Sequence, residues 1–237
     1  LKVARAGTKD ALLSALVLTT LPNHEFPAPI FIDANDVGAP PGPKWNTIAQ
    51  ADVGTALLLS DENGDFTGIT ATLVNGPGTW NNETAPGVWQ QQIGAYAGTI
   101  LEEGTNDYMH IQPAGSAATL ILANLQDDRQ YRLEMSASLD YANVGQYVTL
   151  NGEYAIGWDS STPFNAQTDG FQSGTVLVWD YMSPINGELV LELARVGGAN
   201  AVLNALVLTT IAPEPTAGLL LVIGLGCLVL GRRSRGR

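Results

Sequence analysis

Apolar and polar residues alternate along several stretches of the chain. In residues 131–138 the odd positions are Tyr, Leu, Met and Ala, and the even positions are Arg, Glu, Ser and Ser. In residues 188–193 the leucines occupy the odd positions, and Glu188 and Glu192 occupy even positions. Successive side chains of a β-strand point to opposite faces, so this period of two predicts half-buried strands. Outside the C-terminal tail, no stretch has a convincing helical period.

Further β-rich runs are separated by turn-forming residues. The predicted strands span residues 30–33, 55–60, 69–74, 118–125, 131–139, 146–151, 175–181, 188–195 and 202–210. Residues 61–65, which contain an Asn-Gly pair, and residues 126–130 are predicted hairpin turns. A long polar stretch, residues 75–113, is predicted to form functional loops around one or two short strands, and residues 152–174 are predicted to be another polar loop. With 26 Gly and 13 Pro residues, the pattern predicts an all-β fold, an antiparallel β-sandwich of the jelly-roll type.

Two segments, one at the start of the chain and one at the end of this series of strands, have similar sequences. Residues 1–21 align with residues 191–211 without a gap, at an offset of 190 and with 12 identities in 21 positions. We therefore expect residues 1–21 to be the terminal strands of a preceding repeat copy, residues 22–29 a proline-rich linker, and residues 30–211 one β-sandwich domain. The alternative is a duplicated hairpin within a single domain. On the tandem interpretation, the chain is a fragment of a longer exported protein.

Residues 212–237 combine three features in one order. Pro213, Glu214 and Pro215 precede an uncharged apolar run, residues 217–231, which is followed by Arg232, Arg233, Arg235 and Arg237. Extended by Thr216, the run predicts a short transmembrane helix over residues 216–231. The arginines place the C-terminus in the cytoplasm and the rest of the protein on the outer side.

This order of features resembles the PEP-CTERM protein-sorting signal of Gram-negative bacteria. The resemblance implies an exported protein that is tethered in the inner membrane, with its C-terminus in the cytoplasm. It further implies that an exosortase-type transpeptidase processes the protein near the Pro-Glu-Pro motif, which leaves it at the cell surface or outside the cell. The alternative is an ordinary C-terminal membrane anchor.

Charge excludes one class of partner. The net charge is −12, and without the four tail arginines 7 basic residues stand against 23 acidic ones, so the remainder carries −16. A nucleic-acid partner is not expected, because phosphate binding needs a basic surface. The single cysteine, Cys227, lies in the apolar run, so the exported part forms no disulfide and depends on its core.

The sequence contains little that indicates catalysis. It has no Gly-x-Ser-x-Gly motif, its cysteine lies in the predicted membrane helix, and its two histidines, His24 and His110, have no spacing typical of a zinc site. We expect His110 to be a strand or loop residue. A hydrolase with a pair of carboxylates stays open, because such a pair is spatial rather than sequential. The predicted activity is none, at least for this part of the protein.

Two acidic clusters are candidates for a structural calcium ion, and no other cofactor is expected. Residues 61–65 place oxygen side chains at alternate positions, but Phe66 stands where a calcium loop needs glycine, so a hairpin turn is the favoured interpretation. Asp33, Asn35 and Asp36 follow the first predicted strand and are the better candidates if the sandwich holds calcium.

Aromatic residues provide the candidate binding site. Sugar rings stack on exposed aromatic faces, and four tryptophans lie in Gly-, Asn- and Pro-rich segments typical of loops: Trp45, Trp80, Trp89 and Trp158. Alternatively, these rings close the ends of the sandwich. Trp179 lies within a predicted strand and is assigned to the core.

Several short motifs resemble galactose-binding-like or carbohydrate-binding-module-like domains. They are Phe31-Ile32-Asp33 with Trp45-Asn46, Tyr131-Arg132-Leu133, Tyr147-Val148-Thr149-Leu150-Asn151-Gly152 and Leu203-Asn204-Ala205-Leu206. The resemblance implies a β-sandwich fold more than an activity. The sequence thus predicts a non-catalytic envelope or matrix protein whose sandwich binds extracellular polysaccharide. The alternatives are an accessory module of a hydrolase whose catalytic domain lies upstream of Leu1, and a purely structural or adhesive repeat.

Overall fold

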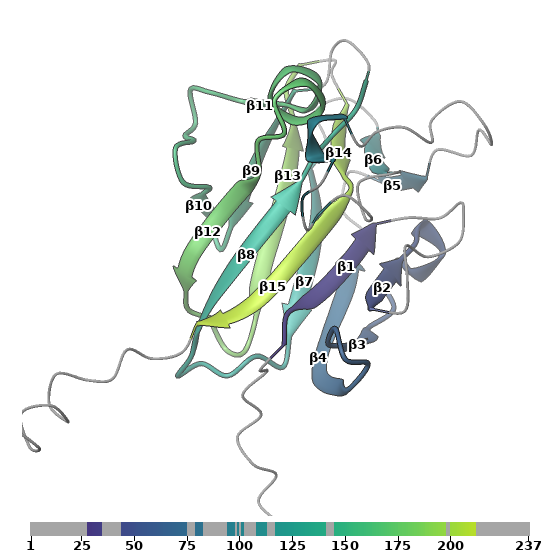
Figure 1. Ribbon diagram of the computed structural model, residues 1–237, viewed down its shortest axis with the longest axis vertical. Helices are drawn as coiled ribbons and strands as arrows, with labels where there is room; N and C mark the ends of the chain where they lie inside the picture. The colour runs from purple at the N-terminus through teal and green to yellow at the C-terminus, as the bar shows by residue number, and fades with distance from the viewer. Residues whose placement is uncertain are drawn as a thin grey trace, which may run out of the picture.

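The computed structural model describes residues 28–34, 44–74, 79–82, 94–97, 99, 101, 108–112, 117–140, 145–197 and 200–211 (Figure 1). These residues form a mostly β structure, so the all-β prediction is confirmed. The strands are β1 (Ile30–Ala34), β2 (Trp45–Ile48), β3 (Leu57–Ser60), β4 (Phe66–Val74), β5 (Thr79–Asn82), β6 (Met109–Gln112), β7 (Ala117–Ala123), β8 (Gln130–Ser136), β9 (Gly145–Leu150), β10 (Glu153–Tyr154), β11 (Phe164–Asn165), β12 (Leu177–Met182), β13 (Leu189–Arg195), β14 (Ala201–Leu203) and β15 (Ala205–Ile211).

Two larger sheets pack face to face, and Figure 1 shows β8 and β15 of one sheet crossing in front of β13 and β7 of the other. The five-stranded sheet has the order β12-β8-β15-β1-β2. The seven-stranded sheet has the order β10-β9-β13-β7-β4-β3, with β11 also paired to β9. A small sheet, β14-β6-β5, extends the structure at one end. The described strand pairs are antiparallel except for β1 and β2, which are parallel.

The predicted alternation determines the core. Tyr131, Leu133 and Met135 of β8 are completely buried, as are the three leucines at the odd positions of β13. Full burial of one leucine contributes about 1.5–3 kcal/mol. The intervening Arg132, Glu134 and Glu192 remain partly or fully exposed. The period of two is therefore confirmed as the source of the apolar layer between the sheets.

The turn predicted at residues 61–65 joins β3 to β4, which pair antiparallel. Its first residue, Asp61, accepts hydrogen bonds at Oδ1 from the backbone N–H groups of Asn63 (2.9 Å) and Asp65 (3.1 Å). Gly64 has φ of +85°, which a residue without a Cβ adopts at no steric cost. The Asp61 carboxylate thus stabilises the hairpin, as the favoured interpretation predicted.

The hairpin predicted at residues 126–130 is wrong. β7 lies in the seven-stranded sheet and pairs with β13 and β4, whereas β8 lies in the five-stranded sheet between β12 and β15. The segment between them therefore crosses from one sheet to the other. Turn-forming residues are needed for either connection, so local composition does not distinguish them.

The single strand predicted over residues 202–210 is interrupted at Asn204. β14 ends at Leu203 and pairs with β6, while β15 begins at Ala205 and pairs with β8 and β1. Asn204 is completely buried. Its Oδ1 accepts from Ser138 N (2.7 Å) and its Nδ2 donates to Ser138 O (3.2 Å). The side chain thus adds two hydrogen bonds to those of the Asn204 backbone, whose N–H donates to Ser136 O and whose carbonyl accepts from Ala34 N.

Residues 152–174 contain regular structure where a loop is predicted. These residues form β10, β11 and η4 (Ala166–Gln172), which is a π-helical segment. Two short 3-10 helices, η1 (Gln50–Asp52) and η2 (Gly94–Tyr96), occur earlier in the chain. Asn165 caps η4 by accepting at Oδ1 from the backbone N–H groups of Gln167 and Thr168. A Cβ on Gly170 would lie 1.9 Å from Ala137 O, so glycine permits η4 to pack against the strand. The period rule missed this helix because it is only seven residues long.

The repeat copy at residues 1–21, most of the linker, and the predicted transmembrane helix at residues 216–231 lie outside the described residues. Within the part of the chain that is described, no helix has the length and hydrophobicity needed to cross a membrane.

Candidate functional site

Two of the four candidate tryptophans are core residues. Trp80, in β5, is 1% exposed and belongs to the main apolar core. Trp45, in β2, is 7% exposed and packs against Phe31 with ring centroids 5.0 Å apart. Neither ring presents a face to solvent, so the prediction that Trp45 and Trp80 stack on sugars is corrected. Trp80 is packed in the main core, and Trp45 is packed in a second apolar cluster. Trp89 lies outside the described residues.

Trp45 is buried because a second apolar cluster covers the outer face of the five-stranded sheet. Phe31 and Val207 are cross-strand partners in β1 and β15, and both belong to this cluster with Trp45 and Tyr96. The Tyr96 hydroxyl donates to Thr175 O, and burial raises the pKa of Tyr96 above its ordinary range. Because both faces of β1 are covered, all five of its residues are buried.

Trp158 is the remaining candidate, and it is partly exposed. Its ring packs edge-on against Phe164, with a centroid distance of 5.1 Å and an interplanar angle of 61°. The surrounding segment is anchored to β12 by two hydrogen bonds: Ile156 N donates to Val178 O (2.8 Å), and Trp179 Nε1 donates to Glu153 O (2.9 Å). The Trp158 ring therefore has a defined position at the side of the structure where the edges of the two sheets meet.

The turn after Trp158 is held by one carboxylate. Asp159 Oδ1 accepts from Ser161 N (2.7 Å), Ser161 Oγ (2.6 Å) and Thr162 N (3.1 Å). These hydrogen bonds, led by the one from the Ser161 hydroxyl, hold the pKa of Asp159 below its ordinary value of 3.8. The carboxylate thus stabilises the turn that follows Trp158.

Two tyrosines lie beside Trp158 on adjacent strands. Tyr147 of β9 and Tyr154 of β10 pack edge to face, with centroids 6.4 Å apart at 78°, and both are partly exposed. Tyr147, Tyr154, Trp158 and Phe164 line one small cavity. We call these four residues the aromatic edge cluster.

Gln146 provides a polar group in the wall of this cavity. It is 1% exposed, and its Oε1 accepts from Val202 N (2.6 Å). Its Nε2 has no hydrogen-bond partner among the described residues. The cavity volume is about 10 Å³, which is close to the space that one water molecule or one hydroxyl group requires. An unpaired buried donor costs about 1–3 kcal/mol, so a polar partner for Nε2 would stabilise the structure.

The sequence did not single out Tyr147, Tyr154 or Gln146 as site residues, although the signal was present. Val148 and Leu150 are inward-facing in β9, so strand alternation places Tyr147 on the outer face. Asn151 and Gly152 form the tight turn to β10, and both have positive φ. This turn brings Tyr154 opposite Thr149, one position from Tyr147 along the face.

Of the three candidate calcium ligands, only Asp33 is among the described residues. Asp33 is completely buried in β1, opposite Ala205, whereas Asn35 and Asp36 lie outside the described residues. No group of three or more His, Cys, Asp or Glu side chains that could hold a metal ion occurs among the residues described. The calcium hypothesis at Asp33, Asn35 and Asp36 stays a prediction.

Of the other residues that the sequence singled out, His110 is among the described residues and the sorting residues are not. His110 is a buried residue of β6, 6.0 Å from the Tyr108 ring, as expected of a strand histidine. The sorting motif, Pro213, Glu214 and Pro215, and the arginines at 232, 233, 235 and 237 lie outside the described residues.

No protein-family model matches the chain, and no curated protein is significantly similar to it in sequence. The sequence motifs and the geometry of the aromatic edge cluster are therefore the observations that bear on function.

Proposed function

We propose that this protein is a non-catalytic, exported protein of the cell envelope or extracellular matrix that binds a polysaccharide through its aromatic edge cluster. The observation that carries the binding proposal is the partly exposed Trp158 ring, oriented beside Tyr147 and Tyr154. Aromatic side chains provide large apolar faces, and such faces can pack against the C–H faces of sugar rings.

The delivery of the protein follows from its C-terminal tail. The Pro213-Glu214-Pro215 motif, a transmembrane helix over residues 216–231 and the terminal arginines form a PEP-CTERM-like signal. On this proposal the jelly-roll sandwich is held outside the inner membrane until an exosortase-type transpeptidase processes the tail. The net charge of −16 outside the tail arginines is compatible with a neutral polysaccharide and unfavourable for a nucleic acid.

Retention on insoluble polysaccharides tests the binding site. The full chain, kept in a mild detergent because of its apolar tail, is passed over cellulose, chitin, xylan and agarose gels. We expect retention on at least one gel and a loss of about 10-fold in affinity for Trp158→Ala, which corresponds to about 1.4 kcal/mol. Phe66→Ala is the matched control, because Phe66 is an aromatic residue 71% exposed in β4.

Near-UV circular dichroism verifies that both variants keep the native packing. Equal retention of Trp158→Ala and the unchanged chain refutes the aromatic site. Failure of every gel to retain the unchanged chain refutes glycan binding and favours the structural or adhesive repeat, which the internal repeat of residues 1–21 and 191–211 independently supports.

Processing of the tail requires a separate experiment. The chain is expressed behind a secretion signal in a host that carries an exosortase, and its mass is measured in the membrane and medium fractions. We expect the unchanged chain to lose its C-terminal residues, and a variant with Pro213→Ala and Glu214→Ala to stay intact in the membrane. Equal processing of both chains contradicts the sorting assignment.

A further inference from the structure

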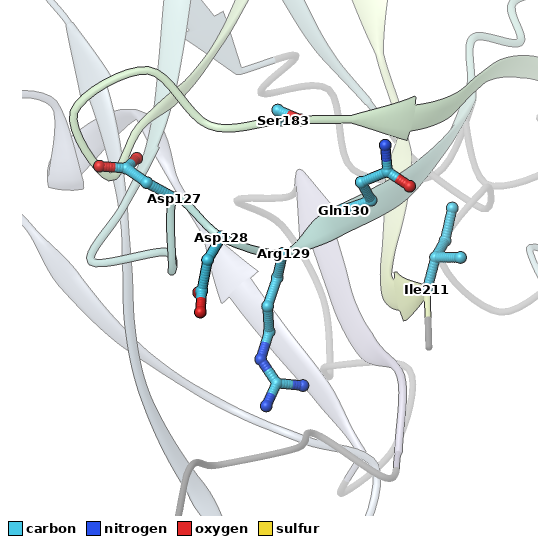
Figure 2. Close-up of a pocket in the computed structure, with 6 residues that line it drawn as sticks. All are labelled: Asp127, Asp128, Arg129, Gln130, Ser183 and Ile211. Carbon is cyan, nitrogen blue, oxygen red and sulfur yellow. The ribbon is translucent and has the colours of Figure 1, made fainter. Parts of the chain in front are cut away.

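A second cavity lies away from the aromatic edge cluster, at the end of the five-stranded sheet where β15 ends. Its volume is about 260 Å³, and it opens to solvent. Figure 2 shows the six residues that line it: Asp127, Asp128, Arg129, Gln130, Ser183 and Ile211. Asp128 and Arg129 extend to the same side of the chain in this view.

Strand register brings these residues together from three strands. Ile211 of β15 is the cross-strand partner of Gln130 in β8. Met182 of β12 is opposite Tyr131, so Ser183 follows at the same end of the sheet. Because Tyr131 points into the core, the neighbouring Gln130 points outward. The crossing segment between β7 and β8 then places Asp127, Asp128 and Arg129 over this edge.

Two contacts hold the polar side chains of the segment in place. Asp127 Oδ1 accepts from Gly187 N (2.6 Å), and Arg129 Nε donates to Gln126 Oε1 (2.5 Å). Within the described residues, Asp128 makes no hydrogen bond or ion pair, and the terminal nitrogens of Arg129 make none either. The cavity therefore has acceptors in its carboxylates and donors in its guanidinium group.

Arg132, which lies within β8, differs from Arg129 in its partners. Its guanidinium group binds both Glu134 (2.7 Å) and Asp180 (2.7 Å). Two carboxylates thus compensate its charge and occupy its donors, which makes it part of the sheet surface. Arg129 is bound only through Nε to a neutral amide, so its two terminal nitrogens remain able to donate to a ligand.

The charges of the lining determine which ligand fits. Two carboxylates and one guanidinium group give a net charge of −1, which disfavours a phosphate or another anion. The described residues contain no group of three metal-ligating side chains, which disfavours a metal ion. A neutral vicinal diol fits, because each hydroxyl can donate to a carboxylate and accept from the guanidinium group. Ile211 adds an apolar surface for C–H groups.

We propose that this cavity binds one ring of a neutral sugar, as a second contact for the glycan that the aromatic edge cluster holds. The inference rests on the proposed glycan-binding function and adds to it a polar subsite for a single ring. The volume of about 260 Å³ lies just below the range of about 300–1,000 Å³ that is typical of ligand pockets, which suits one monosaccharide rather than a longer segment.

Saturation-transfer NMR with the full chain tests the subsite. The probes are the methyl glycosides of glucose, galactose, mannose and N-acetylglucosamine, each titrated without added metal. We expect at least one glycoside to bind, and its affinity to fall at least 10-fold in Asp128→Asn, which keeps the size of the side chain and removes its charge. The control is Glu62→Gln, an exposed acid in the β3–β4 turn.

Trp158→Ala separates this inference from the proposed function. If the subsite exists, the glycoside signal persists in Trp158→Ala and in Glu62→Gln while Asp128→Asn loses it. Unchanged binding by Asp128→Asn overturns the inference, as does binding that appears only with added calcium. If no glycoside binds but Trp158-dependent retention on a polysaccharide persists, the subsite is refuted and the proposed function stands.

Discussion

Replacement of Asn204 by alanine should destabilise the domain strongly. Asn204 lies at the break between β14 and β15, and its side chain forms two hydrogen bonds with the backbone of Ser138. Asn204 and Ser138 are both 0% exposed, so water cannot take over these bonds. Loss of the partner of a buried donor or acceptor costs about 1–3 kcal/mol. The two bonds together predict a loss of about 2–6 kcal/mol in the free energy of unfolding.

Urea unfolding, followed by tryptophan fluorescence in mild detergent, measures this loss. A destabilisation of this size is a large part of the total of about 5–15 kcal/mol for a typical domain. Each 1 kcal/mol should lower the Tm by about 2–4 °C in a domain of this length. Asn63→Ala is the matched control, because Asn63 is exposed in the β3–β4 turn and should change stability by less than about 0.5 kcal/mol.

Two further variants test whether the two hydrogen bonds to Ser138 account for the stabilisation by Asn204. Asn204→Asp keeps an acceptor for Ser138 N but places an oxygen against Ser138 O, so it should be at least as destabilising as alanine at neutral pH. Asn204→Ser introduces the residue that the repeat carries at the equivalent position, Ser14, and should lose at least one of the two bonds. If Asn204→Ala is within 0.5 kcal/mol of the unchanged chain, the side chain does not hold the strand break and the reasoning is refuted.

Three other outcomes follow from the same structure. Leu191→Ala, at a fully buried position of the central β13, should lower the free energy of unfolding in urea by about 2–5 kcal/mol. A loss no larger than that caused by the same substitution at an exposed leucine would contradict the core assignment. Tyr131→Phe removes the hydroxyl that accepts from Gln126 N (3.0 Å) and should cost about 1–3 kcal/mol, with m unchanged. Because the pKa of Asp159 is lowered on folding, its contribution to the Trp158 turn is complete above pH 3.8 and is lost as the pH falls through the lower pKa of the folded state. Polysaccharide retention should therefore be constant from about pH 8 to pH 5 and weaken only below pH 3.8, whereas retention that changes near pH 6 would implicate another group.

Much of the secondary structure could be predicted because its causes are local. Alternation in residues 131–138 and 188–193 identified strands and their buried faces, and the Asn-Gly turn at residues 63–64 identified a hairpin. The aromatic site was predicted only in part. Trp158 was among the candidates, but Tyr147 and Tyr154 join it through a strand pairing that composition does not reveal.

The sequence by itself determined that the domain is all-β and which residues of β8 and β13 face the core. These properties depend on the side-chain period of two and on local composition. Only the tertiary structure decided which strands pair, so the segment after β7 proved to cross between sheets. It also decided that Trp45 and Trp80 are buried while Trp158 is partly exposed. The physical reason is that burial of a ring depends on whether a distant segment covers it, as the cluster with Tyr96 covers Trp45 and Phe31.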